Sequence, residues 1–199
     1  MKRVIPLACA LLLVLFAALI IITKKAYDQQ NTIKRLNTAI VNIETVREED
    51  VTVSKYNFID IQKAVYIEQL SVELHIDPNL SFAILMVENP EFNPDAINKN
   101  INGTVDIGLF QLNDRYVWTT FRDSYWIEGV ELDPFNWKHN CYLAIHHIKY
   151  LQDKLKVEDD VIMAYNCGIG SVINNSVPSS TYAYLAKVKN NMWLLKKGE

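Results

Sequence analysis

From about residue 56 onward, apolar residues recur at three- and four-residue spacing, and no long stretch alternates between apolar and polar residues. The first pattern is typical of amphipathic helices, whereas alternation would indicate strands with one buried face. The sequence therefore predicts a mainly α-helical domain with at most a small hairpin, which we place within the loop 97–110. A domain that spans residues 56–199 is large enough to bury a core of its own.

Capping residues and prolines set the expected helix boundaries. Asp77-Pro78 offers an N-cap followed by a proline at the first helical position, and this helix should run to Glu88. Asp133-Pro134 repeats the signal and should begin a longer helix that ends near Leu155. The remaining helices are expected over 56–75 and 161–165 and from Ser179 onward.

A run of uncharged, mostly apolar residues, 4–22, precedes the domain and has basic residues on both sides. As a helix it would be roughly 28 Å long, close to the hydrocarbon thickness of a bilayer. We interpret 1–23 as an uncleaved transmembrane anchor. The alternative is a cleaved signal peptide, whose apolar core is usually shorter and ends at a small-x-small site. If Lys2 and Arg3 set the orientation, everything after residue 23 lies outside the cytoplasm.

Residues 24–55 are interpreted as a helical stalk. Their apolar residues fit a coiled-coil spacing for only two heptads, and a stable coiled coil needs three or four. We therefore expect a spacer that lifts the domain off the membrane rather than a dimerisation element. These expectations divide the chain into an anchor (1–23), a stalk (24–55) and a catalytic domain (56–199).

Charge and motif content exclude several classes of function. The chain has 20 basic and 23 acidic residues, a net charge of −3, which argues against a nucleic-acid partner. Phosphate-binding glycine loops and zinc-binding motifs are absent from the sequence, so we expect no metal and no cofactor. Three cysteines are too few for a disulfide scaffold, although Cys141 and Cys167 could pair in an oxidising compartment or stay as buried thiols.

Glu88 is the strongest candidate for acid–base chemistry. It follows a run of apolar residues, 82–87, and lies at the C-terminal end of its helix. Burial and the helix dipole both raise the pKa of a carboxyl group at such a position. A carboxylic acid that is still protonated near neutral pH is what general acid catalysis requires. The alternative is an ordinary surface glutamate at a frayed helix end.

Short motifs follow Glu88 in a fixed order. They are Phe-x-Pro-x-Ala at 92–96, Gly-Leu-Phe-Gln at 108–111, Ala-Tyr-Asn-Cys-Gly-Ile-Gly at 164–170 and Thr-x-x-Tyr-Leu-x-x-Val at 181–188. Together with Glu88, and over roughly residues 70–190, they resemble the lysozyme-like lytic transglycosylases of the SLT family, which cleave bacterial peptidoglycan. The run 102–113 is also similar to the small secretion-associated transglycosylases and to animal-type lysozymes. The resemblance implies a mainly α, goose-type lysozyme-like domain.

The sequence departs from the family pattern at four points. Asn89 stands where the family usually has serine, and the interval from Glu88 to Phe92 is one residue longer than usual. Cys141 and Cys167 replace small residues.

The resemblance implies roles for individual residues. Glu88 would be the general acid and base, and Asp106 lies where animal-type lysozymes have a second carboxylate. Asp106 could equally cap a turn with Asn102-Gly103, since Asp is common in such turns. The remaining site residues are expected to support the carboxyl group and line the sugar groove: Gln111, Tyr165, Asn166 and Tyr184.

We therefore expect a peptidoglycan lytic transglycosylase that forms 1,6-anhydro ends and needs no cofactor. One alternative is a lysozyme-like hydrolase that uses Glu88 with Asp106, and the other is a catalytically silent module that binds peptidoglycan in an envelope complex. The expected partners are glycan strands, the membrane and an envelope, secretion or motility complex. The expected location is the bacterial inner membrane, with a single span and the catalytic domain facing the periplasm and cell wall.

Overall fold

The computed structural model describes residue 24, residues 56–120 and residues 132–198. The chain divides into two compact units, Met1–Val51 and Thr52–Glu199, and the fold described below belongs to the second. The expected anchor and nearly all of the expected stalk lie outside the described residues. Within the described ranges, every helix is too short or too polar to cross a bilayer.

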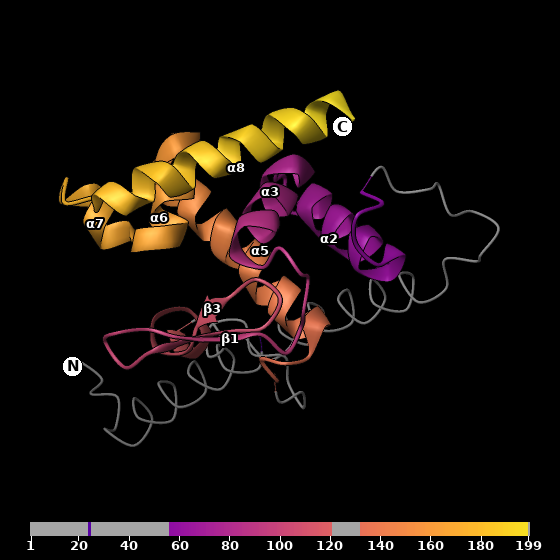
Figure 1. Cartoon of the computed structure of the whole chain (residues 1–199), viewed down its shortest axis with the longest axis horizontal. Coiled ribbons are helices and arrows are strands. Elements are labelled where there is room, and N and C mark those ends of the chain that lie inside the picture. Colours follow the sequence, from indigo (N-terminus) through magenta and orange to yellow (C-terminus); the bar gives the residue numbers. More distant parts are fainter. Residues whose placement is uncertain (1–23, 25–55, 121–131, 199) are drawn as a thin grey trace, which may run out of the picture. The chain divides into compact units, whose positions relative to one another are not determined.

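The domain is mainly α-helical, as the sequence predicts (Figure 1). Helix α8 lies along α3 and α6, and the small sheet lies on the other side of α5 (Figure 1). In chain order the elements are α2 (Ile61–Glu73), α3 (Pro78–Glu88), β1 (Ile97–Lys99), β2 (Val105–Ile107), β3 (Leu112–Asn113), the π-helix η1 (Asp114–Trp118), α5 (Trp137–Leu155), α6 (Glu158–Cys167), α7 (Ile169–Ile173) and α8 (Ser179–Lys197).

Two helices begin later than the sequence predicts. The helix expected from Asp133-Pro134 begins at Trp137, because Asn136 is the N-cap and its side chain accepts the amides of Lys138 and His139. Asp133 instead accepts the amide of Phe135, which makes a turn before the helix. The helix expected from residue 56 begins at Ile61 after its N-cap, Asp60. The π-helix η1 and the short α7 were not predicted.

Helix α3 forms the centre of the core. Its residues from Asn79 to Leu85 are all buried, and Phe82 stacks on Tyr56 with 3.7 Å between ring centroids. Asp77 caps the helix as predicted, through a 2.9 Å bond from the Asn79 amide. A helix buried on nearly every side has little freedom to shift, so the position of its last residue, Glu88, is well defined.

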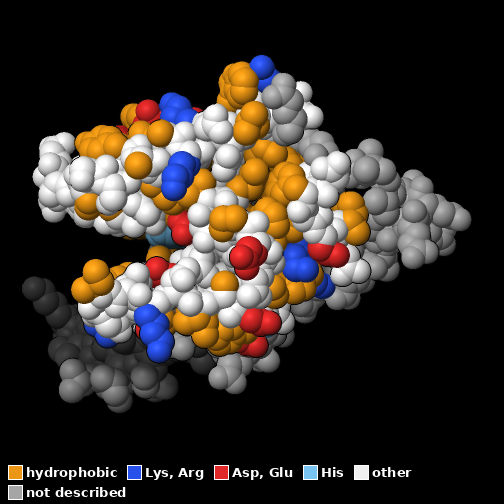
Figure 2. Space-filling view, viewed as in Figure 1, with side chains coloured by type: hydrophobic (Ala, Val, Ile, Leu, Met, Phe, Trp, Pro, Cys, Tyr) orange, Lys and Arg blue, Asp and Glu red, His pale blue; other side chains and the backbone are white. Residues whose placement is uncertain are grey.

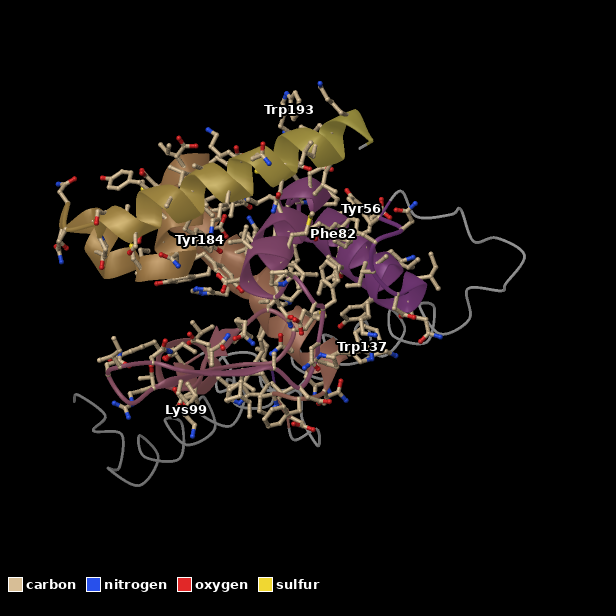
Figure 3. The ribbon with its side chains drawn as sticks, in the orientation of Figure 1. Tyr56, Phe82, Lys99, Trp137, Tyr184 and Trp193 are labelled. Atoms are coloured by element: carbon tan, nitrogen blue, oxygen red, sulfur yellow. The ribbon has the colours of Figure 1, made fainter. Side chains whose placement is uncertain are left out.

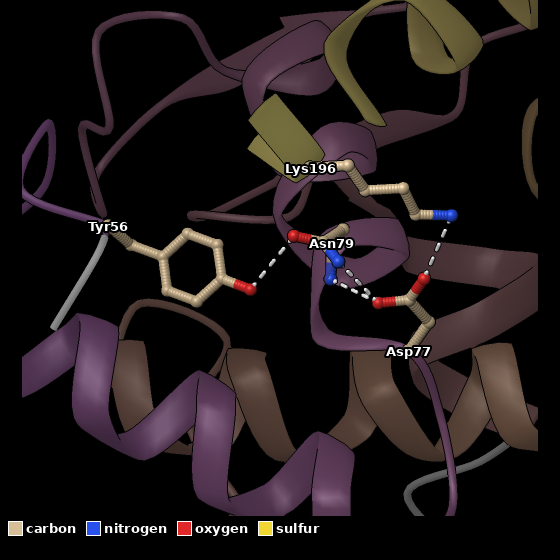
Figure 4. A network of polar contacts seen from close by, with 4 residues as sticks. All are labelled: Tyr56, Asp77, Asn79 and Lys196. Carbon is tan, nitrogen blue, oxygen red and sulfur yellow. Dashed lines mark hydrogen bonds and ion pairs between the residues drawn. The ribbon is translucent and has the colours of Figure 1, made fainter. Parts of the chain in front are cut away.

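Polar contacts tie the start of α3 to its neighbours (Figure 4). Tyr56 donates a 3.1 Å hydrogen bond to Asn79, and Asn79 donates to Asp77 at 2.7 Å. Lys196, near the end of α8, forms a 3.3 Å ion pair with Asp77. Helices α3 and α8 therefore run in opposite directions, which brings the end of α3 near the start of α8.

The sheet is antiparallel with the strand order β1-β2-β3, and it contains the hairpin expected within 97–110. Its register places Asn98 opposite Asp106, and Asp106 opposite Asn113. Since side chains alternate between the two faces of a strand, these three residues share one face. Lys99 lies on the opposite face and points away from the helices (Figure 3). The polar row therefore faces the helical side of the domain.

Candidate active site

Glu88 ends α3 at the point where the chain turns away from the core. The cap residue Asn89 has a non-helical backbone, with φ of −146° and ψ of 79°. Its side chain donates to the carbonyl oxygen of Asn93 at 2.7 Å and accepts the Asn93 amide at 3.1 Å. These two bonds close the loop that is one residue longer than the family pattern, and Phe92 adopts a left-handed backbone within it. Asn89 thus has a local structural role.

Glu88 is half-buried, and the protein atoms around its carboxyl group change its acidity. Burial raises its pKa to about 7, and the negative charge of Asp106 acts in the same direction. A hydrogen bond from Tyr184 acts in the opposite direction and is smaller than the effect of burial. The direction agrees with the sequence-based expectation that a carboxyl group at the end of a buried helix holds its proton. At neutral pH a substantial fraction of Glu88 is protonated.

The two tyrosines of the predicted site have different partners. Tyr184 on α8 donates a 2.7 Å hydrogen bond to Oε1 of Glu88. Tyr165 on α6 donates a 3.0 Å bond to the carbonyl oxygen of Phe110. Burial, followed by the charge of Glu88, raises the pKa of both hydroxyls well above the usual value, so both remain hydrogen-bond donors. Tyr184 contacts the carboxyl group directly, whereas Tyr165 anchors the 108–111 segment to α6.

Asp106 does not cap the turn at Asn102-Gly103. The side chain of Asn102 accepts the Thr104 amide at 3.1 Å and makes the turn instead. Asp106 lies in the middle of β2, where its Oδ2 accepts from Asn100 at 2.9 Å and its Oδ1 accepts from Asn113 at 2.7 Å. The strand register explains this difference, because it places Asp106 between two other strands rather than at the hairpin end.

Gln111 and Asn166 take part in contacts within the protein. Gln111 is buried, and its amide nitrogen donates to the carbonyl oxygens of Gly108 at 2.7 Å and Ala96 at 3.3 Å. Asn166 is exposed on α6 and accepts a 2.8 Å bond from Thr181 of α8. Gln111 therefore shapes the loop beside Asp106, while Asn166 joins the two helices that carry the tyrosines.

Asn140 is a residue that the sequence reasoning missed. It is fully buried on α5, accepts the Phe110 amide at 2.7 Å and donates to the carbonyl oxygen of Ile107 at 2.9 Å. It packs directly against Gly108, whose φ of +79° favours glycine. The sequence does contain a signal for this buried role: Asn140 is a polar residue on the apolar face of its helix, one turn before Ala144.

The structure also shows the state of the two cysteines and of potential metal ligands. Cys141 and Cys167 are free thiols, and Cys141 is fully buried. In the described part of the chain, no three His, Cys, Asp or Glu side chains gather at a distance suited to a metal ion.

A hollow separates the helices α6 to α8 from the sheet, and acidic and histidine side chains lie at its inner end (Figure 2). Tyr184 points into the space between α8 and the sheet (Figure 3). An extended polymer can lie in such an open groove and reach a carboxyl group at its base.

Comparison with protein families identifies one domain. Residues 65–185 match the transglycosylase SLT domain, a family of peptidoglycan lytic transglycosylases. A search among curated proteins gave no significant match. The matched range covers more than half of the chain and contains Glu88, Asp106 and both tyrosines. The chain therefore belongs to the transglycosylase SLT family, whose substrate is peptidoglycan.

Proposed function

We propose that this protein is an active peptidoglycan lytic transglycosylase with Glu88 as its general acid and base. The observation that carries the proposal is the environment of Glu88, where burial raises the pKa to about 7 and Tyr184 donates a 2.7 Å hydrogen bond. A group with a pKa near the working pH can both give and take a proton.

The reaction needs a single carboxyl group. Glu88 donates its proton to the oxygen that links C1 of N-acetylmuramic acid to N-acetylglucosamine, and the C1–O bond breaks. The C6 hydroxyl of the same muramic acid then attacks C1, and the Glu88 carboxylate takes the hydroxyl proton. The products are a 1,6-anhydro end and a free 4-hydroxyl group. Glu88 regains its proton, and no water is consumed.

Tyr184 supports this role by fixing the carboxyl group. Because its hydroxyl donates to Oε1 of Glu88, Oε2 remains to carry the transferred proton. Tyr184 keeps its own proton, since its pKa lies well above the usual value. The hydrogen bond favours the ionised form that Glu88 adopts between the two proton transfers.

Hydrolysis is the second candidate. It is favoured by the effect of Asp106 on Glu88, which indicates that the two carboxyl groups share one site. In a retaining glycosidase the second carboxylate stabilises or traps the sugar cation, and water completes the reaction. The products then carry reducing ends instead of anhydro ends.

We further propose that residues 4–22 anchor the protein in the bacterial inner membrane and that the catalytic domain faces the cell wall. The apolar length and the basic flanks of this segment support the proposal. An envelope, secretion or motility complex that crosses the wall would need such local cleavage.

The test is a digest of purified cell wall by the full-length protein, with products analysed by mass spectrometry. We expect muropeptides that are one water lighter than the hydrolysed form. Glu88→Gln keeps the shape and removes the acid, so cleavage should fall at least about 100-fold. Glu91→Gln, an exposed acid three positions away, is the matched control and should cleave normally.

The other possible outcomes would support a different function or a different acid. Products with reducing ends would support the hydrolase. Absence of cleavage by the wild type, with wall binding retained, would support the silent binding module. Equal cleavage by wild type and Glu88→Gln would exclude Glu88 as the acid.

A further inference from the structure

Two asparagine side chains donate to the carboxylate of Asp106. Asn100 donates to Oδ2 of Asp106 at 2.9 Å, and Asn113 donates to Oδ1 at 2.7 Å. Each carboxylate oxygen thus has its own amide donor, one from the segment after β1 and one from β3. The carboxylate is held from both sides on this face of the sheet.

The hydroxyl of Thr104 fixes both asparagines. It accepts from Asn100 at 3.1 Å and from Asn113 at 2.9 Å, and it donates to Asn102 at 2.8 Å. Thr104 is buried, so water competes little for these bonds. Both Nδ2 groups therefore have two acceptors each, which defines the orientation of the amides and hence of Asp106.

We propose that Asn100 and Asn113 are positioning residues that hold the Asp106 carboxylate on the helical side of the sheet, where its charge acts on Glu88. We call these two asparagines the clamp. The inference rests on the proposed function, because it attributes the protonation of Glu88 in part to the clamp, which holds Asp106 on the sheet. Without the clamp, the Asp106 side chain could rotate toward solvent, where its charge would be screened.

Three groups from the surrounding elements interact with Glu88: Tyr184 and Asp106 change its pKa, and the charge of Glu88 acts in turn on Tyr165. Tyr184 comes from α8, Tyr165 from α6 and Asp106 from β2. His147 on α5 lies behind Tyr165, with 5.5 Å between the rings, and burial lowers its pKa to about 4. It is neutral near pH 7, so Asp106 is the group whose charge acts on Glu88 there.

The test is a titration of the Glu88 carboxyl carbon by NMR in the full-length protein, with the signal assigned by its loss in Glu88→Gln. Asp106→Asn should lower the midpoint by roughly half a pH unit, because a nearby negative charge is removed. Asn100→Ala and Asn113→Ser should each lower it in the same direction by a smaller amount. Serine at 113 can still accept the Arg115 and Tyr116 amides that Asn113 caps.

A double-mutant comparison separates positioning from general loosening of the hairpin. In the Asp106→Asn background, neither Asn100→Ala nor Asn113→Ser should shift the midpoint further. Ile101→Ala, a neutral change at a fully exposed position next to Asn100, is the control and should have no effect. In cleavage assays the falling limb of the pH profile should move to lower pH in parallel with the NMR midpoint.

Two results would overturn the proposal. One is an unchanged midpoint in both clamp variants or in Asp106→Asn. The other is a shift that persists when Asp106 is already neutral. If one clamp variant does not fold, the other supplies the answer. The titration does not depend on cleavage, so retained cleavage by Glu88→Gln would exclude the proposed function and leave the clamp itself testable.

Discussion

The hydroxyl of Tyr184 donates a 2.7 Å hydrogen bond to Oε1 of Glu88, across 96 positions of the chain. The two residues come from α3 and α8, which have the most extensive mutual contact among the described helices. The bond stabilises the ionised carboxylate, whereas burial stabilises the protonated acid. Because burial has the larger effect, Glu88 keeps a pKa of about 7 and has access to both forms.

Tyr184→Phe should raise the pKa of Glu88 further, because it removes the interaction that favours ionisation. The falling limb of the pH profile for cleavage should therefore move to higher pH. Without this hydrogen bond the Glu88 carboxyl group is also less well oriented. The rate of cleavage at neutral pH should therefore fall by about 10-fold, as expected for one hydrogen bond to a charged group. The measurement is the rate of wall cleavage between pH 4 and pH 9.

The matched control is Tyr182→Phe, two positions earlier on α8, where the ring is exposed. Its profile should follow that of the wild type. A Tyr184→Phe profile that moves to lower pH would contradict the assigned role of the hydroxyl.

The protonation of Glu88 also links stability to pH. Between the ordinary carboxyl pKa of about 4.3 and the folded-state value of about 7, the unfolded chain has released this proton and the folded protein still holds it. The free energy of unfolding therefore falls as pH rises through this window, by up to about 3 kcal/mol from this residue. Glu88→Gln lacks the effect.

Urea unfolding of both proteins at pH 4 and pH 8 measures this contribution. Glu88→Gln should gain up to about 3 kcal/mol relative to the wild type between the two pH values. The comparison cancels the opposite effect of His146 and His147. Burial lowers the pKa of each to about 4, so both destabilise the fold at acid pH. An equal difference between the proteins at both pH values would show that Glu88 is an ordinary ionised glutamate.

Gly108→Ala should destabilise the domain by at least about 2 kcal/mol. The backbone at this position has a φ of +79°, and an added Cβ would meet the Asn140 side chain and lie 2.6 Å from the carbonyl oxygen of Pro134. Gly103→Ala is the control, because its φ is +78° with no atom within 4 Å of the added Cβ. It should cost only about 1 kcal/mol.

Thermal or urea unfolding of the two alanine variants compares these costs. Equal costs would show that Asn140 and Pro134 can move away from residue 108. Cleavage should fall more in Gly108→Ala, since Gln111 and the Phe110 contact of Tyr165 belong to the same segment.

The sequence by itself predicted most of the helices and indicated the candidate acid. Asp77-Pro78 sets the start of α3 locally, and the apolar run 82–87 indicates that the helix is buried. A carboxyl group that ends such a helix must be desolvated, so the direction of its pKa shift could be predicted. The hairpin and the order of the motifs could also be predicted, because turn residues and short motifs are recognised from a few neighbouring positions.

Only the tertiary structure decided which polar groups meet. Tyr165 and Tyr184 each follow an alanine in a helix, yet Tyr184 bonds to Glu88 and Tyr165 to a backbone carbonyl. The register of three short strands placed Asp106 between Asn100 and Asn113 instead of at a turn. Hydrogen bonds depend on distances of a few tenths of an ångström between elements far apart in the chain. Packing sets those distances, and local sequence patterns do not encode them.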